Sequence, residues 1–92
     1  MSIKLDIVYS TQFKRDVKLC QKQGKDFEKF KAVHELLMVQ AALPAKNKDH
    51  ALVGNWGGFR ECHLAPDWLL IYRIRGNALE YARMGSHAAL FE

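Results

Sequence analysis

The chain has 92 residues, of which 49% are hydrophobic, and these values exclude both a multidomain protein and a disordered one. No apolar run approaches the roughly 20 residues that a membrane span needs, and the N-terminus lacks the apolar stretch of a signal peptide. Cys20 and Cys62 belong to no CxxC pair, so we expect free thiols in a reducing compartment. We therefore expect one cytoplasmic domain over residues 1–92, with no membrane contact.

The two kinds of basic residue are separated along the chain. The formal net charge is +4, all nine lysines lie in residues 1–50, and four of the five arginines lie in residues 51–92. Lysine is a point charge on a flexible stem, whereas the planar fork of arginine suits phosphate. The net charge by itself fits a nucleic-acid partner and an ordinary solvated surface equally well.

The first half of the chain predicts a strand and two helices. Apolar and polar residues alternate over residues 3–9, which is the period of a strand. Ser10 or Thr11 can cap a first helix that stops at Gly24, and Asp26 can cap a second helix that ends at Pro44. The apolar positions at helical spacing are Phe13, Val17 and Cys20, then Phe27, Phe30, His34, Leu37, Met38 and Ala41. The short turn between the helices predicts an αα-hairpin, with His34 as a structural residue.

The second half predicts a meander of strands after a long loop. Residues 44–58 have no period and contain Pro44 and three glycines, and a loop of about 15 residues in so small a domain is often functional. Strands are expected over residues 59–64, 68–74 and 79–84, separated by turns at Pro66 and at Gly76. The middle strand is apolar on both faces, which indicates a central position.

The order β-α-α-β-β-β predicts an α+β fold. We expect the two N-terminal helices to pack on one face of a small antiparallel sheet and to leave the other face partly open. The short tail after residue 84 would fold back onto the body.

Groups capable of acid–base chemistry gather in this second half, namely His50, His63, Asp67, Arg83 and His87. His63 and Asp67 flank one turn and can face each other across it. On an antiparallel meander, these groups can converge near one end of the open face, although the strand register cannot be read from the sequence. Arg60 and several aromatic residues lie between them.

Metal-independent cleavage of RNA needs the residue types present here. A base must take a proton from the 2′-hydroxyl, and an acid must protonate the departing 5′-oxygen. Histidine, with an ordinary pKa of roughly 6.5, can serve in either role. Arginine can offset the charge that builds on the phosphate, and aromatic rings can stack on bases.

Each of these residues also has an ordinary interpretation. Any of the histidines can be a solvated surface group, Asp67 is a common turn former, and Trp68 can belong to the core with Tyr72. Arg83 can be a solvated strand end. The stripe formed by Lys14, Lys18 and Lys22 can be the wet side of an amphipathic helix. Three histidines can also hold zinc, but their spacing matches no compact ligand motif, so we expect no metal or other cofactor.

Three segments carry a highly specific family pattern. They are residues 48–56 (KDHALVGNW), 59–72 (FRECHLAPDWLLIY) and 83–91 (RMGSHAALF). This pattern resembles the YafQ branch of the RelE/ParE toxin superfamily, and the β-α-α order and the length upstream fit the same branch. The resemblance therefore spans essentially the whole chain.

This resemblance implies a toxin of a type II toxin–antitoxin pair that enters the ribosomal A site and cleaves mRNA there. The catalytic set that it implies is His50, His63, Asp67, Arg83 and His87, with Trp68 and Phe91 positioning the substrate. His87 would be the general acid, and His63, aided by Asp67, would be the base, a role that His50 could share. Arg83 would stabilise the phosphate.

The resemblance also gives the other basic residues a purpose and names partners. Lys14, Lys18 and Lys22 would dock on ribosomal RNA, and Arg60 would assist substrate binding. The antitoxin would combine a flexible segment that folds over the toxin with a ribbon-helix-helix dimer that binds DNA, so the toxin would reach DNA only indirectly. Two rivals remain, a gyrase-inhibiting toxin of the ParE type and a catalytically silent RNA-binding module.

Overall fold

The structure, a computed structural model, describes residues 5–91. The helices and strands are β1 (Asp6–Tyr9), α1 (Thr11–Lys22), α2 (Phe27–Met38), β2 (His50–Ala51), β3 (Arg60–Ala65), β4 (Trp68–Arg75), β5 (Ala78–Gly85) and α3 (His87–Phe91). Two 3₁₀ turns, η1 (Ala45–Asn47) and η2 (Gly54–Trp56), flank β2. The predicted α+β order is confirmed, and the expected strand start at Ile3 lies outside the described residues. No helix within residues 5–91 is long and apolar enough to cross a bilayer.

The strands form one sheet in the order β1-β5-β4-β3-β2, so β4 is central, as its apolar sequence predicted. Strands β2 to β5 pair antiparallel, but β1 pairs parallel with β5, so the sheet is mixed rather than wholly antiparallel. The expectation of an antiparallel sheet is wrong in this respect, because the two helices carry the chain back before the meander starts. The expected long loop also contains the short edge strand β2.

Local capping explains where the two long helices begin and end. Ser10 Oγ accepts the Phe13 N–H at 2.9 Å, and Asp26 Oδ1 accepts the Glu28 N–H at 3.1 Å, as the sequence predicted. Gly24 follows α1 with a left-handed φ of +73°.

Helix α2 ends at Met38 and not near Pro44, as had been expected. Gln40 takes the left-handed conformation (φ +55°), and the Ala41 N–H bonds to the Leu36 carbonyl at 2.9 Å. Because no glycine stands there, this earlier end could not be predicted from the residues.

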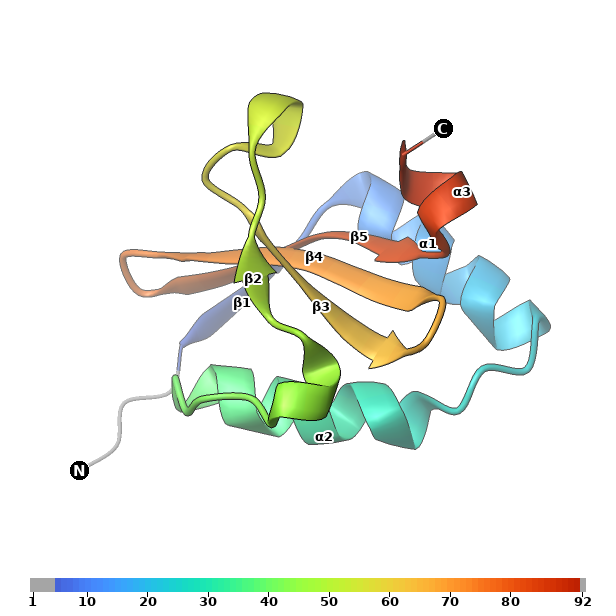
Figure 1. Cartoon of the computed structure of the whole chain (residues 1–92), viewed down its shortest axis with the longest axis horizontal. Coiled ribbons are helices and arrows are strands. Elements are labelled where there is room, and N and C mark those ends of the chain that lie inside the picture. Colours follow the sequence, from blue (N-terminus) through green and yellow to red (C-terminus); the bar gives the residue numbers. More distant parts are fainter. Residues whose placement is uncertain (1–4, 92) are drawn as a thin grey trace.

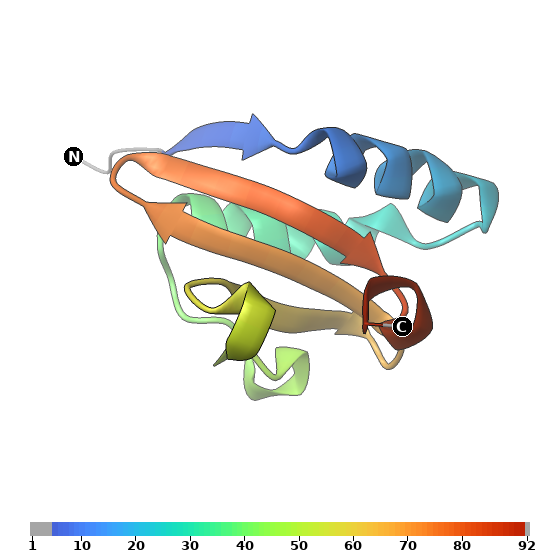
Figure 2. The same cartoon turned by 90° about the horizontal axis from the view of Figure 1, so that it is seen from above.

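The two faces of the sheet are covered by different elements. Helix α2 lies on one side, whereas α3 and the segment around η2 lie on the other (Figure 1). Residues of α1 and α2, including Phe13 and Val33, share the main core with one face of β3, β4 and β5. Figure 2 shows α1 continuing from the end of β1 beside β5. A smaller cluster, built on Leu69, Ile71 and Leu90, covers part of the opposite face.

Candidate active site

Three imidazoles form a row on the face of the sheet that α1 and α2 leave open. The ring centroids of His50 and His63 are 6.5 Å apart, and those of His63 and His87 are 5.8 Å apart. His50 comes from edge strand β2, His63 from β3 and His87 from the first position of α3. Residues far apart in the sequence therefore meet at one site, which we call the histidine row.

Glu61 lies beneath the histidine row and was not predicted. Its Oε1 lies 3.5 Å from Nε2 of both His50 and His63. Only 5% of the residue is exposed, so its carboxylate faces the imidazoles rather than water. Its position two residues before His63 on the same strand, and hence on the same face, is the signal that could have revealed it.

Asp67 pairs with His87 and not with His63, which corrects the expected geometry. Its Oδ1 lies 2.8 Å from His87 Nδ1 and accepts the His87 backbone N–H at 3.0 Å. These bonds from the backbone and the ring of His87 lower the pKa of Asp67. An ionised Asp67 requires the proton of His87 on Nδ1, which leaves Nε2 as the ring atom available for proton exchange. The start of α3 brings His87 to Asp67, and this contact depends on tertiary structure.

Arg83 lies on the same face of the sheet as the imidazoles. It is the β5 partner of Ile71, and Ile71 is also the partner of Glu61 on β3. Directly opposed residues in a sheet project to the same side, so Arg83 and Glu61 are two strands apart on one face. The guanidinium is held by Asp16 of α1, with Nε at 2.8 Å from Oδ2.

The aromatic residues expected to position the substrate separate into two groups. The ring of Phe91 lies 6.4 Å from that of His87, and 44% of this residue is exposed. Trp68, by contrast, is 1% exposed and packs edge-on against Phe27 at 5.2 Å. The expectation that Trp68 contacts substrate is therefore wrong, because its position on β4 directs the side chain into the helix-covered core.

The other predicted basic residues lie away from the histidine row. Arg60 pairs with Tyr72 on the helix-covered face, and its Nε donates to Asp49 Oδ1 at 3.2 Å. It therefore projects from the face of the sheet opposite to His63, and the structure does not bring it together with the histidine row. The stripe of Lys14, Lys18 and Lys22 is exposed on α1, whose inner side buries Phe13 and Cys20.

His34 is structural, as predicted, since its Nδ1 lies 2.7 Å from the Tyr81 hydroxyl. Its ring also stacks on Phe30 within the helix-covered face. Burial lowers the pKa of His34 and so favours the neutral ring. Cys20 and Cys62 are free and buried, as expected.

Residues 5–92 match the family model described as bacterial toxin of type II toxin–antitoxin system, YafQ. The chain belongs to the YafQ family. It is 49% identical over 90 residues to the mRNA interferase toxin YafQ of Escherichia coli K12, covering 97% of this chain and 98% of that protein.

Two solved structures show the same fold as this YafQ-family chain. The E. coli DinJ–YafQ toxin–antitoxin complex contains a chain with 48% identity and a TM-score of 0.89, covering 98% of this chain and 100% of the other. A metal-bound toxin from Helicobacter pylori has 43% identity and a TM-score of 0.88, covering 95% of this chain and 99% of that one.

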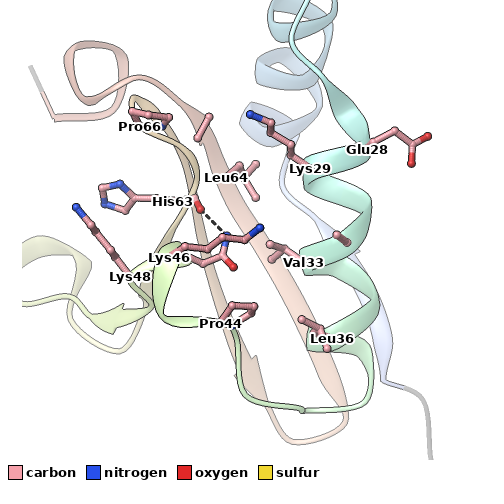
Figure 3. A pocket seen from close by; sticks show the side chains of 13 residues that line it. Glu28, Lys29, Val33, Leu36, Pro44, Lys46, Lys48, His63, Leu64 and Pro66 are labelled. Atoms are coloured by element: carbon pink, nitrogen blue, oxygen red, sulfur yellow. Dashed lines mark hydrogen bonds between the residues drawn. The ribbon is translucent and has the colours of Figure 1, made fainter.

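A groove of about 660 Å³ lies behind the histidine row, between α2, η1 and the end of β3. His63 contributes its backbone carbonyl, which accepts a hydrogen bond from Asn47 Nδ2 at 2.8 Å. Its imidazole points away from the groove (Figure 3). This groove is therefore separate from the acid–base groups, which lie on an open surface of this YafQ-family toxin.

Glu61, His63 and His87 also form a set that could hold a metal ion. One ligand atom from each lies within 4.8 Å of the others. Two imidazoles and a carboxylate suit zinc or a similar transition metal. This set differs from the three histidines weighed from the sequence, because Glu61 replaces His50.

Proposed function

We propose that this toxin is a ribosome-dependent endoribonuclease that cleaves mRNA in the A site by metal-independent acid–base catalysis and thereby inhibits translation. The observation that carries the proposal is the row of three imidazoles on an open face, each within reach of a carboxylate. The E. coli relative at 49% identity, named as an mRNA interferase toxin, supports the same activity. A purely inhibitory binder would not need several proton-transfer groups together.

His87 is proposed as the general acid. Asp67 holds its Nδ1 at 2.8 Å, which fixes the ring and leaves Nε2 to protonate the departing 5′-oxygen. His63 is proposed as the base that takes the proton of the 2′-hydroxyl, and Glu61, rather than Asp67, is the carboxylate beside it. His50 touches the same Glu61 oxygen and can share this role.

The remaining residues of the site are proposed to bind and stabilise the RNA. As the 2′-oxygen bonds to phosphorus and the 5′-oxygen leaves, charge builds on the phosphate, and Arg83 is a cation on this face that can offset it. The exposed ring of Phe91 beside His87 suits stacking on a base. The lysine stripe on α1 is proposed to dock on ribosomal RNA, with binding that weakens steeply as salt is raised.

The toxin is also proposed to bind a cognate antitoxin, because the E. coli relative forms a complex with DinJ. We propose an antitoxin whose flexible segment folds over the toxin and whose ribbon-helix-helix part binds DNA. The toxin then meets DNA only through this complex. Its site of action is proposed to be the cytoplasm, where the ribosomes are.

The test is to add purified toxin to translating ribosomes and to map mRNA 5′ ends by primer extension. Cuts within codons that disappear with His63→Ala support the proposal, and a parallel reaction without ribosomes tests ribosome dependence. DNA breaks by gyrase without mRNA cuts would instead identify a ParE-type toxin. Neither product would identify a silent binding module.

A further inference from the structure

Asp16, on the inner side of α1, binds the guanidinium of Arg83, which lies 67 residues later in the chain. Arg83 Nε donates to Oδ2 at 2.8 Å, and Nη2 donates to Oδ1 at 3.2 Å. Asp16 is only 7% exposed, so this side-on fork is shielded from water. An arginine held in two places by a buried carboxylate has a fixed plane as well as a fixed position.

The fold explains why a carboxylate stands at this point. Strand β1 ends at Tyr9, so the last residues of β5 have no strand neighbour on that side, and the start of α1 replaces it. Ser10 Oγ donates to the Ala82 carbonyl at 2.7 Å, and Asp16 Oδ2 accepts the Met84 N–H at 3.0 Å. Asp16 thus accepts a backbone N–H at the edge of β5 that β1 leaves unpaired, and the same carboxylate binds Arg83.

The two hydrogen bonds to Asp16 leave part of the guanidinium available to bind a phosphate. Arginine carries five N–H donors, and Asp16 takes one on Nε and one on Nη2. The other three donors, one on Nη2 and two on Nη1, make no hydrogen bond within residues 5–91, and 21% of the Arg83 side chain is exposed. Because Asp16 binds the Nε and Nη2 side of the planar guanidinium, the remaining donors point in a fixed direction.

We infer that Asp16 is a positioning residue for RNA cleavage, acting only through Arg83 by aiming its free edge at the reacting phosphate. This inference rests on the proposed endoribonuclease activity. It goes beyond that proposal because Asp16 belongs to α1, outside the sequence segments that carry the histidines.

The decisive variant is Asp16→Asn. The amide keeps an oxygen that can accept the Met84 N–H, but its NH₂ group opposes a guanidinium donor, so the fork is lost while the edge bond survives. In single-turnover cleavage on programmed ribosomes, we expect kcat to fall on the order of 10- to 100-fold. KM should stay the same or fall, because the variant carries one fewer negative charge near the RNA.

Two controls separate positioning from a structural role. Asp26→Asn makes the same chemical change at the N-cap of α2, away from the site, and should leave kcat unchanged. In an Arg83→Ala background, Asp16→Asn should lower kcat no further, because its only route to the reaction is gone. The Arg83 Nη2–H resonance, observed by NMR, should exchange slowly in the wild type and rapidly in Asp16→Asn, because the Asn oxygen that keeps the Met84 N–H can also keep Nε–H, whereas the amide NH₂ group faces Nη2.

The inference is overturned if Asp16→Asn cleaves at the wild-type rate, or if it lowers kcat equally with and without Arg83. Should this variant fail to fold, Arg83→Lys serves instead. It keeps the charge and Asp16 but loses the fork, so kcat should fall nearly as far as in Arg83→Ala. A lysine variant with wild-type kcat overturns the inference. A wild-type chain that cuts no mRNA overturns the proposed function itself, whatever the NMR result.

Discussion

The two faces of the sheet have different roles in this protein: one forms the core with the helices, and the other carries the candidate active site. On β3, Cys62 and Leu64 are buried in the core beneath the helices, whereas His63 belongs to the histidine row and Glu61 lies beneath that row. On β4, Leu70 and Tyr72 join that same core, whereas Leu69 and Ile71 support the open face together with Leu90 of α3. Since neighbouring residues of a strand project to opposite sides, stability and chemistry are divided by parity along the same strands.

The sharpest test of this division is His87→Ala on the open face. Removal of a positioned acid should lower the cleavage rate by about 10²- to 10⁴-fold, with little change in thermal midpoint. Single-turnover assays on ribosomes and thermal melts measure the two quantities. Full cleavage by this variant would refute the assignment of the acid.

A matched histidine on the other face is His34, which bonds to Tyr81. His34→Gln should lower the thermal midpoint and leave the cleavage rate of the folded protein unchanged. A large loss of activity in this control would break the comparison between the faces.

The next largest effect is expected in the core. Leu70 is 0% exposed beneath the helices, so Leu70→Ala should lower the free energy of unfolding by about 2–5 kcal/mol. Urea denaturation measures this loss. The cleavage rate per folded molecule should stay near that of the wild type, and a drop as large as that of His87→Ala would show that the faces are coupled.

A smaller, pH-dependent effect is expected for Asp67→Asn. Folding lowers the pKa of Asp67 through its bonds to the backbone and ring of His87, so the ionised carboxylate stabilises the folded state. That stabilisation is complete above the unfolded pKa of roughly 4 and disappears as the pH falls through the lower, folded value. The melting temperature of Asp67→Asn should therefore lie below that of the wild type at pH 7 and converge with it in acid. A difference that stays constant down to pH 2 would contradict this linkage.

The smallest expected effect is that of metal removal. If the open face works through imidazoles alone, treatment with EDTA should leave the cleavage rate unchanged. Loss of activity that zinc restores would instead assign Glu61, His63 and His87 as ligands. The H. pylori relative described as metal-bound makes this a necessary experiment.

Much of the fold could be predicted because its signals are local. The caps Ser10 and Asp26, the stop at Gly24 and the doubly apolar run of β4 each involve residues a few positions apart. The early end of α2 could not be predicted, because Gln40 takes a conformation that usually favours glycine.

The candidate site could be predicted only as a set of residue types. The family pattern pointed to His50, His63 and His87, and the structure brings their rings together. Residue types, however, did not reveal that Glu61 lies under two of the rings, nor that Asp67 forms a hydrogen bond with the ring of His87. Those pairings depend on strand register and on the path of the tail, which no short segment specifies.

The sequence by itself determined the two long helices and the four longer strands, their order, the family and the histidines, because periodicity, capping and motif are properties of neighbouring residues. Tertiary structure alone decided the parallel pairing of β1 and the burial of Trp68. It also decided the pairing of Arg60 with Asp49 on the helix-covered face and the hydrogen bonds between Asp16 and Arg83. The physical reason is that each of these contacts joins segments distant in the chain, whose alignment is fixed only when the whole core packs.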